Sequence, residues 1–94
     1  MEQTKLTSYV RVFKALANHR RLSLFNFIAD YPNKSVMQLA DELDFSYKST
    51  AQHLTKLASA GLITKSPVNN QSIQSVSPFG QKVLTNLSKL ISWD

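Results

Sequence analysis

One stretch of the sequence, residues 47–60, carries polar side chains at helical spacing that could bond to the edges of nucleic-acid bases. If this stretch is a helix, a rotation of about 100° per residue turns Lys48, Gln52 and Thr55 to one side and the leucines to the other. Glutamine can make two hydrogen bonds to adenine, lysine can reach guanine or a phosphate, and threonine offers a short hydroxyl. These residue types and their spacing predict contacts with the major groove of DNA.

The position of each side chain along this stretch predicts its partner. Helices that enter a major groove contact bases chiefly through their N-terminal turns, so we rank Tyr47, Lys48 and Gln52 first for the bases. Lys56 lies on the flank of the polar face, where a phosphate is the expected partner. The complete set that we predict to contact DNA is Ser46, Tyr47, Lys48, Ser49, Gln52, Thr55, Lys56 and Lys65.

An arbitrary amphipathic helix would carry the same polar face merely as its solvated side, so the surroundings decide between the two interpretations. Ser35 and Gln38 have the spacing of a capping box, which predicts that a short helix begins there. After a tight turn, Ser46 can cap the following helix and Gly61 can end it. Two short capped helices joined by a tight turn are typical of a helix-turn-helix motif, which favours DNA binding.

Apolar spacing, caps and turn residues predict the other elements. Asn18 and Ser77 are good caps, Pro32 stops a helix, and Pro78 fits the first position of another. Partial period-2 alternation on either side of the polar loop 67–71 predicts a hairpin. The expected elements are helices over about 5–17 and 19–31, the two helices of the helix-turn-helix, strands over 62–66 and 72–77, and a last helix over 78–92. The predicted fold class is mainly α with a small β-hairpin.

Composition limits the class of protein. The chain has 94 residues, of which 43% are hydrophobic and 18% charged, and this balance is typical of a single globular domain. Without cysteine it cannot form a disulfide or a thiolate metal site. We find no signal peptide and no run of the roughly 18 to 20 apolar residues that a membrane span needs, so we expect a cytoplasmic protein. The net charge of +5 suits a polyanionic partner.

Three segments resemble one family of regulators. The run QLADELDFSYKSTAQHLTKLASAGLI is similar, without a gap, to the helix-turn-helix of the arsenical-resistance-type (ArsR-like) winged-helix repressors, including the Ser46 cap and the Ala-Gly-Leu ending. The segment KALANHRRLSLFNFIAD, with Arg21-Leu22, resembles the family's entry into its second helix, and SVSPFGQKVL resembles the lead into its last helix. The resemblance covers about residues 13–90 and implies a winged helix-turn-helix fold.

The resemblance also implies a homodimeric transcriptional repressor, in which helix 47–60 enters the major groove and the hairpin is the wing. It places the dimer interface on the first and last helices, for which we select Leu6, Tyr9, Val10, Phe13, Leu84, Leu87 and Ile91. Both helices carry apolar stripes wider than so small a domain needs for its own core, and a short chain gains from burying more apolar surface in a dimer. The alternative is that both stripes simply close the core of the monomer.

The chain lacks the residues through which many relatives sense metals. A tetrahedral zinc site needs about four converging nitrogen, sulfur or oxygen ligands. Here His19 and His53 lie on different predicted helices, and the last helix has no His, Asp or Glu before Asp94. We therefore expect no metal and no cofactor, and we interpret His53 as a packing or capping residue and His19 as a residue of a first helical turn.

The predicted wing and recognition helix also depart from the family pattern. Wings often place a basic side chain toward the minor groove, where narrow A-tracts attract positive charge. Residues 68–75 contain Asn, Gln and Ser but no Arg or Lys, and Lys65 at the base of the wing is the nearby cation. Ala51 and Gln52 stand where relatives often carry larger or basic residues. The resemblance therefore transfers the geometry of DNA binding but not an operator sequence.

Two other functions compete with that of a sequence-specific regulator that binds double-stranded DNA. A winged helix can serve protein contacts, and then the polar wing and the acidic Asp41, Glu42 and Asp44 would form the surface of an adaptor without salt-dependent affinity for duplex DNA. An enzyme is disfavoured because the chain has no cysteine nucleophile, its histidines lie on separate elements, and its two glycines make no phosphate-binding loop. A DNA-binding repressor without membrane contact is the prediction.

Overall fold

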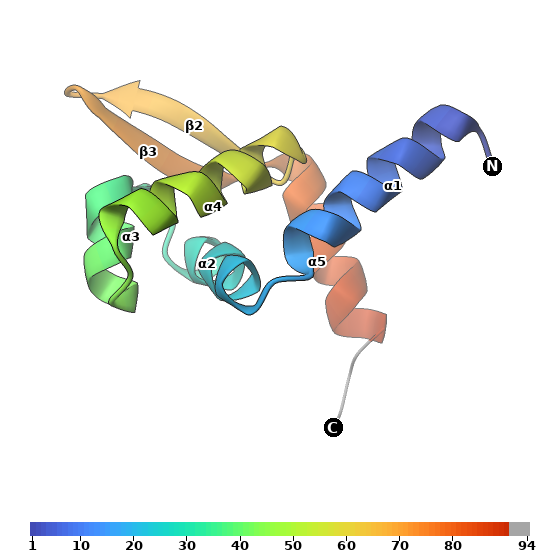
Figure 1. Ribbon diagram of the computed structural model, residues 1–94, viewed down its shortest axis with the longest axis horizontal. Coiled ribbons are helices and arrows are strands. Elements are labelled where there is room, and N and C mark those ends of the chain that lie inside the picture. The colour runs from blue at the N-terminus through green and yellow to red at the C-terminus, as the bar shows by residue number, and fades with distance from the viewer. Residues whose placement is uncertain (91–94) are drawn as a thin grey trace.

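A computed structural model describes residues 1–90 of the chain, and residues 91–94 lie outside that description. Its elements follow the order α1 (Gln3–Leu16), α2 (His19–Asp30), β1 (Lys34–Ser35), α3 (Val36–Leu43), α4 (Tyr47–Ser59), β2 (Ile63–Val68), β3 (Gln71–Val76) and α5 (Pro78–Leu90). The predicted helices and the hairpin are confirmed in the predicted order, although α1 begins two residues earlier than expected. Figure 1 shows α1 and α5 at one side of the molecule and the hairpin of β2 and β3 at the other.

α2 supplies the centre of the hydrophobic core. Its side chains Leu24, Phe25 and Ile28 are at most 1% exposed. Buried side chains from α3, α4 and the start of the wing pack around them, namely Leu39, Leu54, Leu57, Leu62 and Ile63. Burying each large apolar side chain contributes roughly 1.5–3 kcal/mol. This core therefore fixes how α3 and α4 sit on α2.

The helix caps that the sequence predicted are present in the structure. Asn18 accepts a bond from the backbone N–H of Arg21 at 3.0 Å and so caps α2. Ser35 and Gln38 form a reciprocal capping box at the start of α3, because each side chain accepts from the backbone N–H of the other, at 3.2 and 2.9 Å. Gly61 follows α4 with a φ of 77°, the left-handed conformation expected of it.

A third short strand extends the sheet of the wing. β3 lies between β2 and β1, and both pairings are antiparallel. In the pairing of β1 with β3, Lys34 lies opposite Gln74 and Ser35 lies opposite Ile73. β1 was not predicted, because a strand of two residues is too short to show alternation in the sequence.

The hairpin has longer strands and a tighter turn than predicted. β2 and β3 stay paired until Val68 lies opposite Gln71, which leaves Asn69 and Asn70 as a two-residue turn in place of the longer predicted loop. Both asparagines have positive φ, 49° and 64°, as a type I′ turn requires. Pro67 is accommodated within β2 because this is an edge strand, where a missing N–H is tolerated.

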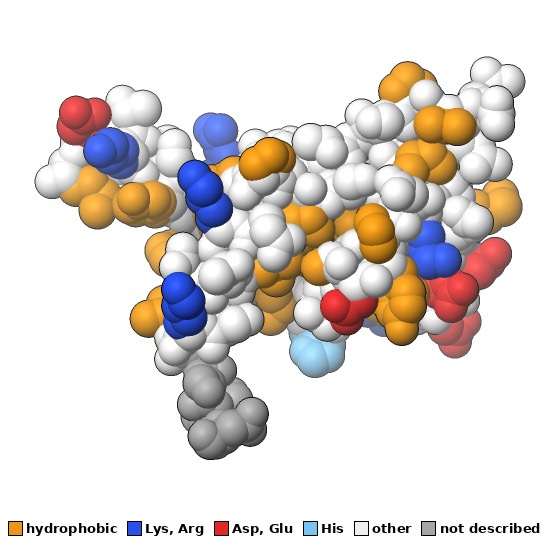
Figure 2. All heavy atoms as spheres, turned by 180° about the vertical axis from the view of Figure 1, so that it is seen from behind, with side chains coloured by type: hydrophobic (Ala, Val, Ile, Leu, Met, Phe, Trp, Pro, Cys, Tyr) orange, Lys and Arg blue, Asp and Glu red, His pale blue; other side chains and the backbone are white. Residues whose placement is uncertain are grey.

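α1 and α5 carry apolar side chains that the rest of the described chain leaves uncovered. The buried residues of α1 are Val12 and Ala15, whereas Phe13 is 66% exposed. On α5, Gly80 is buried and Leu90 is 79% exposed. In the view from behind, apolar side chains show at the surface over both helices (Figure 2). The outer faces of α1 and α5 are therefore not part of the core of the described chain.

Candidate nucleic-acid interface

α4 turns one face into the core and the other to solvent. Thr50, Leu54 and Leu57 are fully buried and anchor the helix. The opposite face carries Lys48, Gln52, Thr55 and Lys56, which are exposed, and Ser49, which is half-buried. Tyr47 is also exposed, but a rotation of about 100° per residue places it nearer the side of Thr50. The predicted polar face thus exists as one continuous solvent-facing surface.

Hydroxyl groups of the predicted set help to hold α4 itself. The Oγ atom of Ser46 accepts a bond from the backbone N–H of Ser49 at 3.1 Å and caps the helix. The hydroxyl of Thr55 donates to the carbonyl of Ala51 at 3.0 Å. A hydroxyl that donates to backbone can still accept from a ligand, but it no longer offers its proton. The longer side chains of the face, such as Gln52, therefore offer more for base recognition.

The turn between α3 and α4 fixes the direction in which the polar face points. Asp44 ends α3 with a φ of 56°, a left-handed conformation that aspartate tolerates better than most residues. The backbone N–H of Phe45 then donates to the carbonyl of Ala40 at 2.9 Å. The guanidinium of Arg20 lies 5.1 Å from the centre of the Phe45 ring, so α2 also supports the turn.

The tip of the wing offers polar but uncharged groups. Its tip extends beyond α3 (Figure 1), and Val68 there is 49% exposed. Lys65, the cation that we predicted for DNA, is exposed on β2 opposite Gln74. Residues 68–75 hold amides and hydroxyls without Lys or Arg. Contacts by the wing would therefore add little electrostatic attraction.

One protein-family model, described as HVO_A0114, matches residues 16–84, which is more than half of the chain. The chain belongs to the HVO_A0114 family. The matched region runs from the end of α1 into α5 and therefore includes the helix-turn-helix and the wing. A comparison with curated protein sequences finds no match.

Solved structures of winged-helix regulators share the fold of this HVO_A0114 family member. HlyU from Vibrio cholerae is similar with a TM-score of 0.79 and 27% identity, over 96% of this chain and 97% of that one. The homodimeric winged helix-turn-helix DNA-binding domain Mb0332 from Mycobacterium bovis, a possible ArsR-family regulator, has a TM-score of 0.81 and 24% identity, over 93% and 80%. An ArsR-like transcriptional regulator from Rhodococcus sp. RHA1 has a TM-score of 0.77 and 20% identity, over 93% of this chain and 81% of that one. The predicted ArsR-like winged-helix fold is confirmed.

A buried arginine, whose role was not predicted, joins three helices of this family member. Arg21 is 9% exposed, and its guanidinium donates from Nε to the carbonyl of Ala15 at 2.7 Å and from Nη2 to that of Lys14 at 3.3 Å. Both carbonyls lie in the last turn of α1, where helix carbonyls lack partners and a positive charge is favourable. Nη1 of Arg21 lies 3.4 Å from Nδ1 of His53 on α4. Arg21 thus ties the end of α1 to α4.

The contact with Arg21 determines which protonation state of the His53 ring fits the structure. A guanidinium has no acceptor, so Nδ1 of His53 accepts the bond and the ring is neutral. Burial lowers the pKa of His53 from its usual 6.5, and the positive charges of Arg21, Lys56 and Arg20 lower it further. A packed, neutral ring fits the interpretation of His53 as a structural residue.

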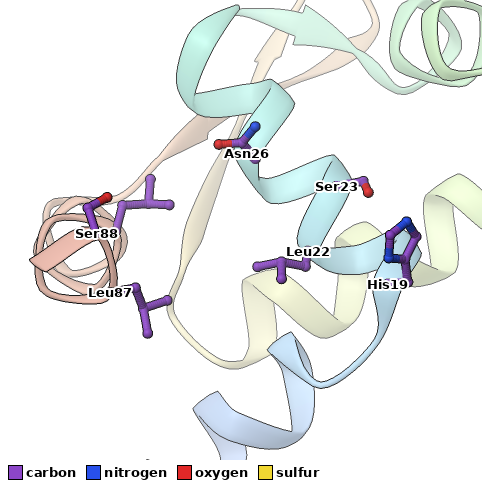
Figure 3. Close-up of a pocket in the computed structure, with 7 residues that line it drawn as sticks. His19, Leu22, Ser23, Asn26, Leu87 and Ser88 are labelled. Atoms are coloured by element: carbon purple, nitrogen blue, oxygen red, sulfur yellow. The ribbon is translucent and has the colours of Figure 1, made fainter. Parts of the chain in front are cut away.

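His19 lies apart from His53, beside a hollow between α2 and α5. The hollow has a volume of about 410 Å³. Figure 3 shows Leu22 and Leu87 pointing toward each other across it, with Asn26 and Ser88 near one end. Within residues 1–90, no three His, Asp or Glu side chains gather closely enough to hold a metal ion. In the same part of the chain, no helix is both long and apolar enough to cross a membrane.

Proposed function

We propose that this protein is a sequence-specific regulator that binds double-stranded DNA as a homodimer, with α4 in the major groove. It acts in the cytoplasm as a repressor, by occupying promoter DNA, and not as an enzyme. The observation that carries the proposal is the exposed polar face of α4, with Lys48 and Gln52, held by a capped helix-turn-helix. The net charge of +5 supports a polyanionic partner. Two proteins of the same fold support it as well, since one is described as a DNA-binding domain and the other as a transcriptional regulator.

The homodimer rests on the outer faces of α1 and α5. The α1 side chains that we predicted for the interface are between 41% and 66% exposed, namely Leu6, Tyr9, Val10 and Phe13. On α5, Leu84 and Leu87 are half-buried, and Ile91 lies outside the described residues. A groove of about 350 Å³ runs between the two helices and is lined partly by Phe79 and Leu90. A second copy that packs the same helices here would cover this apolar surface.

The test of DNA binding is the double substitution Lys48→Ala with Gln52→Ala. Each side chain that bonds to a base contributes roughly 1–3 kcal/mol, so we expect operator affinity to fall by about tenfold or more while the far-ultraviolet spectrum stays unchanged. Fluorescence anisotropy of a labelled duplex, titrated at several salt concentrations, measures this loss. If three cations of each protomer meet phosphates, the logarithm of the wild-type binding constant falls against the logarithm of salt with a slope of about −5.

The matched control is Gln81→Ala with Lys89→Ala, which removes the same two residue types from exposed positions of α5. This control should bind DNA like the wild type. Equal losses in the two double variants would contradict the assignment of α4 as the recognition helix. A wild-type protein that shows no affinity for duplex DNA even at low salt would move the interpretation to an adaptor whose acidic turn and polar wing contact another protein.

A further inference from the structure

A cleft rich in positive charge lies between the C-terminal halves of α1 and α4. It has a volume of about 340 Å³ and is lined by Arg11, Lys14, Ala15, Arg21, Lys56 and Ser59. Four of these side chains are cationic, and the described residues that line the cleft include no acidic one. We call this site the basic cleft. It brings together α1, α2 and α4, which contribute their cations from separate parts of the sequence.

The charge of the basic cleft is partly fixed in place. Arg21 is 9% exposed and is held by the carbonyls at the end of α1, so its guanidinium cannot swing out into solvent. Arg11, Lys14 and Lys56 are exposed around it. Near this cluster the pKa of His53 is lowered, first by burial and then by charges that include Arg21 and Lys56. The neighbourhood is therefore electropositive.

Acidic side chains lie elsewhere. Asp41, Glu42 and Asp44 belong to α3 and the turn after it. Figure 1 shows that α3 lies beside the N-terminal end of α4, whereas the basic cleft lies at the end that approaches α1. Like charges held close together repel one another, and an anion that enters between them removes this cost.

We propose that the basic cleft binds a phosphate group. Guanidinium and ammonium groups form short, charge-assisted hydrogen bonds with phosphate oxygens, and Ser59 adds a hydroxyl. The volume of the cleft falls at the lower end of the roughly 300–1,000 Å³ that is usual for ligand sites, which suits a small anion with part of its ester.

The phosphate has two possible sources. Lys56 belongs both to the flank of the polar face of α4 and to the basic cleft, so a backbone phosphate beside the groove that α4 enters would reach the cleft. This source rests on the proposed function. The other source is a free phosphorylated small molecule, which would bind at the edge of the DNA-facing surface as a ligand.

The first arm of the test uses inorganic phosphate as the probe. Phosphate is titrated into isotope-labelled full-length protein at constant ionic strength, and nuclear magnetic resonance follows the backbone amides of residues 11–15 and 56–59. We expect saturable shifts confined to these amides, with an affinity about tenfold or more weaker in the variant Arg11→Gln with Lys14→Gln. The matched control, Lys5→Gln with Lys89→Gln, removes two exposed cations outside the cleft and should titrate like the wild type.

The second arm measures the salt dependence of binding to a random-sequence duplex with the same three proteins. If the cleft of each protomer holds a backbone phosphate, the slope of log K against log salt becomes shallower by about 2 for a dimer of the cleft variant. The control should keep the wild-type slope.

The outcomes separate the two sources from each other and from the proposed function. A shallower slope in the cleft variant alone assigns the site to the DNA backbone, whether or not free phosphate also shifts the amides. Saturable shifts of the amides with an unchanged salt slope assign the basic cleft to a free phosphorylated ligand. If the protein shows these shifts but does not bind DNA, the proposal that the cleft binds phosphate stands and the proposed function is wrong. DNA binding in which the cleft variant equals the control, together with absent phosphate shifts, overturns the proposal and leaves the proposed function standing.

Discussion

Arg21 and His53 make the stability of the fold sensitive to protons. The pKa of His53 is lowered in the folded chain, so as the pH falls through about 6.5 the unfolded chain binds a proton before the folded chain does. We therefore expect the free energy of unfolding to decrease from pH 7.5 to pH 5.5. Urea unfolding of the wild type at these two pH values measures the change.

The variant His53→Gln separates this effect from other titrating groups. Glutamine can still accept from Arg21 but carries no titrating proton, so the variant should lose less stability over the same interval than the wild type does. The two proteins differ only at position 53, so the difference between their losses reports on His53. Parallel losses in the two proteins would show that His53 does not sense pH.

At the residue scale, the sequence predicted those roles that depend on near neighbours. The caps Asn18, Ser35 and Ser46 each bond to a backbone N–H three residues ahead, and such a spacing is visible in the sequence. Arg21 instead bonds to carbonyls of the preceding helix and lies against His53, 32 residues away in the sequence. Every residue type has a backbone carbonyl, so no pattern of residues in the sequence marks these acceptors. The role of Arg21 is therefore visible only in the structure.

At the element scale, Gly80 holds α5 against the base of the wing. A Cβ atom added there would overlap the carbonyl oxygen of Leu62 and would lie 2.9 Å from Cγ1 of Val76. Because backbone cannot swing aside as a flexible side chain does, we expect Gly80→Ala to lower the free energy of unfolding by about 1–3 kcal/mol or more. Denaturant unfolding measures this change.

Gly61 provides the comparison for that measurement. Its added Cβ would meet Phe79 at an ordinary 3.9 Å, but its φ of 77° is a left-handed conformation that strains alanine. We expect Gly61→Ala to cost about 1–2 kcal/mol through this strain alone. A Gly80→Ala protein that is as stable as the wild type would contradict the close approach of α5 to Leu62.

The helices were predicted more accurately than the strands, for a physical reason. Helix periodicity and caps are local, and the first residue of α4 and the proline start of α5 were both predicted. The pairing of strands is not local, since β1 exists because Lys34 and Ser35 meet β3 almost 40 residues later in the chain. The sequence predicted a loop over 67–71 in place of the tight Asn69–Asn70 turn, because proline and asparagine are typical of longer loops as well as of tight turns.

At the scale of the whole molecule, a charge on α1 should separate the proposed dimer. Phe13 is 66% exposed and belongs to the predicted interface, and Phe13→Glu would place an unpaired carboxylate in an apolar contact. We expect the dimer dissociation constant to rise by about tenfold or more, since burying such a charge costs well over ~1.4 kcal/mol. Sedimentation equilibrium measures the change.

Tyr31→Glu is the control for this experiment. Tyr31 is a similarly exposed aromatic residue, at 55%, but it follows α2 and lies outside both predicted interface helices. The control should sediment like the wild type. Unchanged association in Phe13→Glu would remove α1 from the dimer interface.

The polar face of α4 was visible in the sequence, and the basic cleft was not. Lys48, Gln52 and Lys56 share one helix, so a single period of about 100° per residue assembles their surface. The cleft needs Arg11 and Arg21 from two other helices, and the packing of α1 and α2 against α4 brings these side chains to Lys56. A surface on one helix can be predicted from the helical periodicity of its sequence. A site shared among several helices can be recognised only when their packing is known.

The sparse burial of α1 has a consequence for how the protein responds to dilution. Residues 3–11 of this helix are all exposed, and the turns that they form gain little from the body of the monomer. Helices of this length are marginal in water by themselves, so in a separated monomer the amide hydrogens of these turns should exchange rapidly with solvent. Association would then order the helix as well as bury it. Protection of the α1 amides would rise with protein concentration, while protection of the core amides of α2 would not.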